Sequence, residues 1–140
     1  MTPSYAIKAE VEDLDQAEFD FPRQKTMYGG RKIAAGAEIF VFASEIGGGP
    51  GLIARGVVTA AQAIPGQPGI ARQTPRVSIR VQRVALAKRR LDRAALKDCC
   101  QWDDGRPETE LNFKFYRQAT NKIVGISDVT AEFLRGHFED

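Results

Sequence analysis

The chain has 140 residues, of which 43% are hydrophobic and 27% charged, and its formal net charge is +2. This length predicts one domain over residues 1–140 that is stable without disulfides or metals, and the composition excludes a disordered chain. No apolar run approaches the length of a membrane span, and no secretion signal is visible. The only cysteines, Cys99 and Cys100, are adjacent and cannot close a loop, so we expect reduced thiols and a cytoplasmic location.

The first half of the chain predicts three strands. An apolar strand over residues 5–11 precedes a mixed segment, residues 15–33, which has no clean period and is interpreted as mostly irregular. Residues 38–44 contain a continuous apolar run, typical of a strand that is buried on both faces. A glycine-rich turn leads into a return strand over residues 52–63, where Gly56 marks a bulge or a close backbone approach.

The second half begins with a proline- and glycine-rich loop over residues 64–75. Residues 76–86 alternate as a half-buried strand with a basic outer face, and a slip in the alternation predicts a bulge near Gln82–Arg83. A helix is expected over residues 88–100, with Leu91, Ala94, Ala95 and Cys99 on one face.

The last third predicts two short strands and a helix. Residues 111–116 alternate between apolar and polar side chains, and residues 122–126 form another apolar strand. Ser127 caps a terminal helix that directs Val129, Phe133 and Phe138 toward the core. Together these elements predict a mainly β fold with flanking helices (α+β), in which five to six mostly antiparallel strands form a small barrel.

Several kinds of chemistry are excluded by what the chain lacks. His137 is the only histidine, so neither a Cys/His zinc site nor a Ser-His-Asp arrangement is expected. The glycine-rich turn matches no phosphate-binding loop. We therefore expect no metal, no cofactor and no catalytic residue of these classes.

Two clusters of hydrogen-bond donors and aromatic residues remain. Such groups stack on bases, read base edges or hold phosphates, although each cluster taken alone is also compatible with a solvated loop. Trp102 is interpreted as a core anchor, with a stacking surface as the alternative. The clusters comprise Arg23, Gln24, Lys25, Thr26, Tyr28, Arg31 and Lys32 in the first, and Tyr116, Arg117, Gln118, Thr120, Asn121 and Lys122 in the second.

The order of these elements resembles the PUA-like superfamily, which includes the PUA, ASCH, YTH and EVE domains. Residues 33–44 look like the short turn and buried strand that open the central barrel hairpin of these domains. Residues 52–60 (LIARGVVTA) look like the strand that follows, and a strand followed by a Ser127-capped helix fits the end of the fold. The similarity in element order spans nearly the whole chain.

The resemblance implies a pocket at the barrel mouth that accepts a nucleobase, including modified bases, flipped from its stack. Tyr28 or Tyr116 would supply the stacking face, and the pocket is expected to have Tyr28 and Ser44 on its wall. The implied pocket residues are Arg23, Lys25, Tyr28, Ser44, Glu45, Tyr116, Arg117, Gln118 and Asn121, and the implied phosphate contacts are Arg76, Arg80 and Arg83.

Three functions are compatible with this sequence. The first is a nucleic-acid-binding module for RNA or DNA, which acts alone or beside an unidentified protein partner. The second is an ASCH-like small hydrolase or ribonuclease that uses Lys25, Thr26 and Glu45, with Glu45 as the general base because no histidine is available. The third is a protein-interaction domain that uses the loop over residues 64–75.

Overall fold

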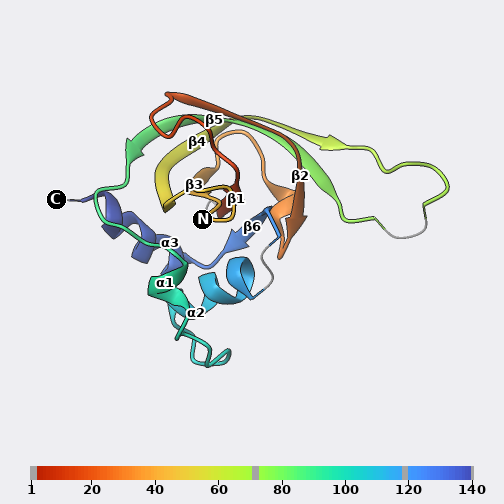
Figure 1. The fold of residues 1–140 in the computed structure, drawn as a ribbon. Helices are drawn as coiled ribbons and strands as arrows, with labels where there is room; N and C mark the ends of the chain where they lie inside the picture. The colour runs from red at the N-terminus through yellow and green to blue at the C-terminus, as the bar shows by residue number, and fades with distance from the viewer. Residues whose placement is uncertain (1–2, 71–72, 118–119, 140) are drawn as a thin grey trace.

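The computed structural model describes residues 3–70, 73–117 and 120–139. Six strands form a closed barrel in the order β1-β3-β4-β5-β2-β6 (Figure 1). β1 pairs in parallel with β3, and β2 with β6, whereas the other four pairings are antiparallel. The predicted mainly β barrel is therefore confirmed. The strands are β1 (Ser4–Ala9), β2 (Glu18–Met27), β3 (Glu38–Ala43), β4 (Gly51–Ile64), β5 (Arg76–Leu86) and β6 (Lys122–Ile126).

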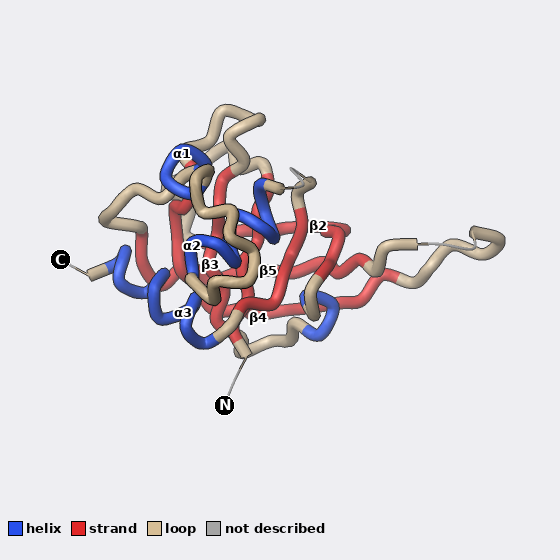
Figure 2. The backbone as a smooth tube through the Cα atoms, turned by 90° about the horizontal axis from the view of Figure 1, so that it is seen from below, coloured by secondary structure: helices blue, strands red, loops and turns tan. Residues whose placement is uncertain are grey.

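Apart from one short turn, the helices lie together on one side of the barrel (Figure 2). Ser127 caps the longest of them as predicted, because its Oγ accepts a hydrogen bond from the Thr130 N–H at 3.2 Å. The helical segments are η1 (Gly30–Lys32), α1 (Arg93–Leu96), α2 (Pro107–Leu111), the π-helical turn η2 (Asn112–Tyr116), α3 (Asp128–Arg135) and η3 (Gly136–Phe138).

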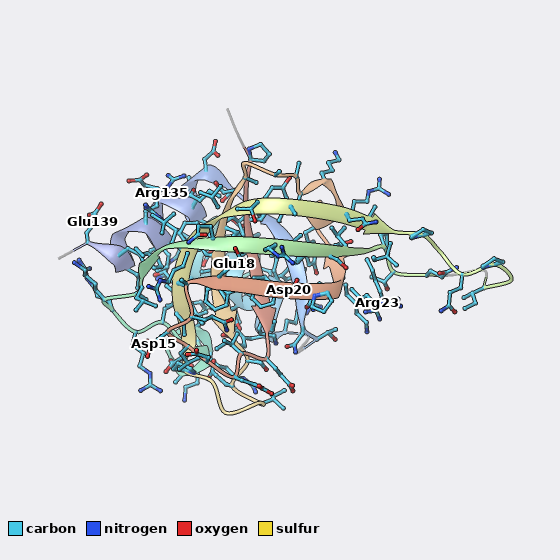
Figure 3. All side chains as sticks on the ribbon, turned by 90° about the horizontal axis from the view of Figure 1, so that it is seen from above. Asp15, Glu18, Asp20, Arg23, Arg135 and Glu139 are labelled. Atoms are coloured by element: carbon cyan, nitrogen blue, oxygen red, sulfur yellow. The ribbon has the colours of Figure 1, made fainter. Side chains whose placement is uncertain are left out.

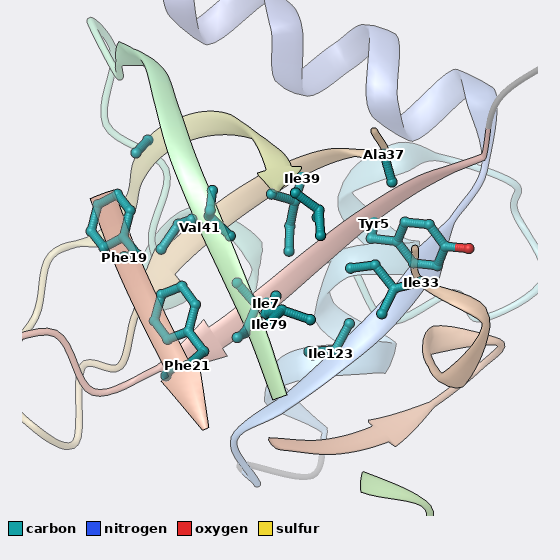
Figure 4. Packing of buried hydrophobic residues seen from close by; sticks show 14 of the residues in the cluster. Tyr5, Ile7, Phe19, Phe21, Ile33, Ala37, Ile39, Val41, Ile79 and Ile123 are labelled. Carbon is teal, nitrogen blue, oxygen red and sulfur yellow. The ribbon is translucent and has the colours of Figure 1, made fainter. Parts of the chain in front are cut away.

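Two apolar cores explain why β1 is buried along its whole length. One face of β1 points into the barrel, where Tyr5 and Ile7 pack with residues of the other strands (Figure 4). Its other face lies under the helices, where Ala6 packs in a second core with Phe42 and Phe115. Side chains thus fill the barrel interior, and a ligand would have to bind at the rim or outside it.

The prediction that residues 15–33 are mostly irregular is wrong, because β2 occupies ten of them. Phe19 and Phe21 alternate inward and stack with ring centroids 5.7 Å apart. Beyond them the register shifts, so that Pro22 and Arg23 together stand opposite Ser78. This β-bulge interrupts the period of two on which strand prediction rests, and so it hides the strand in the sequence.

The prediction of a strand over residues 111–116 is also wrong, because the chain there continues from α2 into η2. Pro107 at the start of α2 and Glu108 in its first turn both favour a helix. Leu111 and Phe115 are fully buried, and their spacing of four residues puts both on one helical face. Residues four apart also lie on one face of a strand, so in such a short segment the spacing does not distinguish a helix from a strand.

The helix predicted over residues 88–100 is limited to α1, which begins at its cap Asp92. Ala94 and Ala95, which were expected on its inner face, are exposed. In α3 the expected inner face is rotated: Val129 is 61% exposed, whereas Leu134 is fully buried. Phe138 packs in the core as predicted, and Phe133 packs partly against it.

β4 and β5 pair across a long hairpin whose tip leaves the barrel (Figure 1). The two predicted irregularities of this hairpin are present. A Cβ atom on Gly56 would come within 2.5 Å of the Gln82 carbonyl oxygen, and Val84 is skipped in the pairing with β4. We call the projecting part the arm, which comprises residues 62–70 and 73–78.

Candidate functional site

The bulge in β2 holds Arg23 in a backbone conformation that residues other than glycine seldom adopt. Its φ is 53°. The Arg23 N–H donates to Ser78 Oγ at 2.9 Å, and its carbonyl accepts from Arg76 Nη1 at 2.8 Å. Such a conformation costs roughly 1–3 kcal/mol, which these contacts with β5 help to offset. The bulge places Arg23 in the middle of β2, beside the part of β5 that belongs to the arm (Figure 3).

Two adjoining hollows meet at this bulge. The larger, about 830 Å³, is lined by residues of the arm, including Arg76, and by Arg23. The smaller, about 290 Å³, shares these two arginines and extends to the loop before β6. We call the surface of the two hollows the basic groove. Its polar and charged centre is the smaller hollow, which is lined by Arg23, Gln24, Lys25, Arg76, Thr120 and Asn121.

The basic groove carries uncompensated positive charge. None of the described residues that line either hollow is an aspartate or a glutamate. In the part of the chain that the structure covers, neither Arg23 nor Lys25 forms an ion pair. Cations without acidic partners, at the edge of a low-dielectric wall, attract an anion more strongly than cations in ion pairs. The groove is therefore suited to phosphate groups.

The other two arginines predicted to contact phosphates lie outside the groove. Arg80 is flanked on β2 by Glu18, which it approaches to 3.6 Å, and by Asp20, its partner in the strand pairing. Arg83 donates from Nη1 to the carbonyl oxygens of Asp15 and Gln16 at 2.5 and 3.3 Å, so it anchors the loop before β2. Phosphate contacts by these two residues remain a prediction.

Two buried lysines lie on the outer face of the barrel. Lys8 and Lys122 stand directly opposite each other in the β1–β6 pairing, and they are only 2% and 1% exposed. Lys8 Nζ donates to the Phe115 carbonyl at 2.9 Å, and Lys122 Nζ donates to the Thr120 carbonyl at 3.1 Å. Burial, together with the charges of Lys8 and Lys25, lowers the pKa of Lys122 to about 8. Burial also lowers the pKa of Lys8.

The lowered pKa of Lys122 predicts that the free energy of unfolding rises with pH. Between pH 8 and about 10.5 an unfolded chain keeps the Lys122 proton that the folded chain has lost, so unfolding takes up a proton. We expect the free energy of unfolding to increase by on the order of 1 kcal/mol from pH 7.5 to 9.5, measured by urea denaturation. Lys122→Met should remove most of the increase, whereas the exposed Lys97→Met should keep it. An equal rise in both variants would show that the increase does not come from Lys122.

Glu45 and Tyr116, both predicted pocket residues, contact each other. The Tyr116 hydroxyl donates to Glu45 Oε1 at 3.1 Å, and the Arg93 N–H donates to the same oxygen at 2.8 Å. Burial and the neighbouring Glu45 raise the pKa of Tyr116. The Tyr116 ring is 9% exposed, with Lys8 Nζ 5.2 Å from its centroid, so it presents no open face to a base.

Tyr28 and Ser44 were expected on the wall of one pocket, but the structure places them apart. The Tyr28 carbonyl accepts from the N–H of Gly125, which pairs with the beginning of β1. Ser44 is buried, and its N–H donates to Ala9 at the other end of β1. The sequence could not reveal this separation, because it depends on how β2 and β6 pair.

The remaining predicted pocket residues divide into two places. Arg23, Lys25 and Asn121 meet in the basic groove, together with Arg76. Arg117 lies instead beside the ring of Phe113, which Tyr28 also contacts. Gln118 lies outside the described residues.

The residues of the hydrolase alternative are engaged separately. Thr26 is buried and donates from Oγ1 to the Pro75 carbonyl at 2.7 Å, next to the arm. Glu45 is bound to Tyr116 and α1. Lys25 lines the basic groove. The three residues are therefore held by different contacts, and the hydrolase constellation stays a prediction.

Sequence reasoning missed Lys8 and the surroundings of Trp102. A lysine between apolar neighbours on both sides, as in residues 5–9 (YAIKA), was a signal for Lys8. Trp102 is 44% exposed, so it is not a core anchor. Its partner Phe113 was assigned to a strand, and so the two rings could not be placed together.

The described part of the chain contains no helix that is long and apolar enough to cross a membrane.

The closed barrel with helices on one side is the PUA-like fold. Human THYN1 protein in complex with 5-methylcytosine-containing DNA has this fold: its TM-score to this chain is 0.67 at 18% identity, over 99% of each chain. The DUF55 domain of human thymocyte nuclear protein 1 superposes with a TM-score of 0.64 at 19% identity, over 97% of this chain and 98% of that one. A Pseudomonas putida protein has a TM-score of 0.61 at 14% identity, over 97% of this chain and 99% of that one.

No protein-family model and no curated protein matches the sequence significantly. The structural likeness, at these identities, shows the fold alone.

Proposed function

We propose that this protein is a nucleic-acid-binding module that holds the phosphate backbone in the basic groove and recognises a modified base, with methylated cytosine as the leading candidate. The observation that carries the proposal is the groove itself, where Arg23, Lys25 and Arg76 meet without an acidic residue in the lining. Such a surface supplies the sequence-independent part of nucleic-acid affinity.

The choice of ligand rests on the fold comparison. Human THYN1 protein, whose fold matches over 99% of both chains, was solved in complex with DNA that contains 5-methylcytosine. The free thiols of Cys99 and Cys100 support a reducing, cytoplasmic location. An additional protein partner is compatible with the exposed arm.

The test is a panel of DNA and RNA oligonucleotides of one sequence, with a single cytosine either methylated or not, measured by fluorescence anisotropy. We expect binding that weakens steeply with salt, and tighter binding of the methylated DNA by about fourfold, since one buried methyl group contributes about 0.8 kcal/mol. Absence of binding at low salt would reject the proposal. Equal affinity for both forms would reject the part that concerns modification.

The same samples test the hydrolase alternative. Oligonucleotides are expected to remain intact after incubation. Cleavage that disappears in Glu45→Gln would favour the enzyme instead.

A further inference from the structure

Three aromatic rings gather on the surface of the helical layer. Trp102 packs edge-on against Phe113 with ring centroids 5.5 Å apart, and Tyr28 approaches the same Phe113 at 5.8 Å. Trp102 is 44% exposed and Tyr28 42%. None of the three belongs to either of the apolar cores. We call these residues the ring cluster. Trp102 and Tyr28 thus keep much of their surface accessible, outside both cores.

A cation covers the rings from the end of η2. The Arg117 guanidinium lies 4.9 Å from the Phe113 centroid and 5.5 Å from that of Trp102. Within the described residues Arg117 forms no ion pair, whereas Arg106 is paired with Glu108 at 2.8 Å. Arg117 is thus the uncompensated charge beside the rings.

The ring cluster borders a cavity of about 200 Å³, whose walls include Trp102, Phe113 and Arg106. Besides Glu108, which pairs with the lining residue Arg106, the carboxylates of Glu110 and Asp104 lie at or near the cavity, and both accept hydrogen bonds. Glu110 accepts from Lys114, Ser127 and Thr130, and Asp104 accepts from Thr109 Oγ1 and the Arg106 N–H. Lys114 offsets the charge of Glu110, whereas the two donors to Asp104 are uncharged and leave its negative charge in place. The cavity therefore has aromatic walls, with the cation of Arg117 over the rings and a carboxylate near its edge.

We propose that the ring cluster stacks a nucleobase of the bound strand, while Arg117 neutralises a neighbouring phosphate. This inference rests on the proposed nucleic-acid binding. Every base has a face that stacks on aromatic side chains, and a nearby guanidinium complements the charge of the nucleotide. The distance from Arg117 to Thr120 of the basic groove is at most about 11 Å, the reach of three residues. One strand can therefore occupy both places.

Trp102 is the only tryptophan, so the tryptophan fluorescence of the protein reports directly on the ring cluster. The probe is an eight-nucleotide single-stranded DNA that contains one 5-methylcytosine, titrated with anisotropy and tryptophan emission recorded together. We expect quenching that follows the anisotropy isotherm. A deoxyribose-phosphate chain of the same length without bases should bind weakly at the groove and leave the emission unchanged.

Substitution gives a second readout. Trp102→Ala should weaken binding of the same DNA about 5- to 140-fold, without changing the slope of its salt dependence, because stacking releases no counterions. Trp102→Phe should retain most of the affinity. Unchanged urea midpoints would show that the partly exposed position tolerates both changes.

The outcomes separate the two proposals. Binding seen by anisotropy, with unchanged emission and wild-type affinity in Trp102→Ala, would overturn the stacking site and leave nucleic-acid binding intact. Equal quenching by the chain without bases would also overturn the stacking site. No change in anisotropy at low salt would overturn both proposals.

Discussion

Replacing Arg23, Lys25 and Arg76 together by alanine is expected to weaken binding of duplex DNA about 500-fold at 0.1 M salt. Each phosphate contact contributes about 0.9 to the slope of log affinity against log salt, so three contacts are worth about 2.7 logarithmic units at that concentration. The three side chains line the smaller hollow, and Arg23 and Arg76 also line the larger one; the described walls of both hold no carboxylate that would offset these charges. Fluorescence anisotropy with a labelled duplex measures the loss.

The matched control removes the same charge elsewhere. Arg31, Lys32 and Lys97 are exposed and lie outside the basic groove. Their triple alanine variant has the same net charge as the groove variant, so a general effect of charge would weaken both equally. We expect the control to lose much less affinity. Equal losses would mean that the overall charge, and not the groove, attracts the nucleic acid. Because Arg76 also holds the carbonyl of Arg23, both variants are first compared by urea denaturation.

The second large effect concerns α3. Leu134 is fully buried between this helix and the barrel, so Leu134→Ala is expected to lower the free energy of unfolding by about 2–5 kcal/mol. Val129, on the same helix, is 61% exposed, and Val129→Ala is expected to change stability by less than about 0.5 kcal/mol. Urea denaturation of the two variants decides between the two possible faces of the helix. A larger loss in Val129→Ala would show that the helix is rotated from the orientation described.

That pair of substitutions also shows where sequence reasoning stopped. The Ser127 cap and the helix were predictable, because capping depends on local chemistry. Which face of α3 is buried depends on contacts with the barrel, and the sequence offers apolar side chains on both faces. The central hairpin of β3 and β4 was predictable for a similar reason, since its apolar runs and glycine-rich turn are local signals.

The candidate site was partly predictable. Arg23, Lys25 and Asn121 were selected as polar residues in segments expected to be irregular, and the pairing of β2 with β5 and β6 brings them together with Arg76. The same pairing separates Tyr28 from Ser44, and no local pattern indicates that. Tyr116 was expected at the end of a strand, but as part of η2 it donates its hydroxyl to Glu45.

The two proposals together place a bound strand along one path. The arm and the bulge of β2 form one wall of the groove, which continues to the loop before β6. Beyond that loop lie Arg117 and the exposed rings of Trp102 and Tyr28. The groove would supply affinity and the rings would hold a base, a division that is common in proteins that bind single strands.

The most direct test of this account is the salt dependence of binding. Affinity of the unaltered chain and of the Arg23, Lys25 and Arg76 triple alanine variant for one duplex is measured by anisotropy between 50 and 200 mM salt. The account predicts that the slope of log affinity against log salt becomes shallower by about 2.7 in the variant, because three phosphate contacts are lost. An unchanged slope would contradict it, because the basic groove would then not be where the backbone binds.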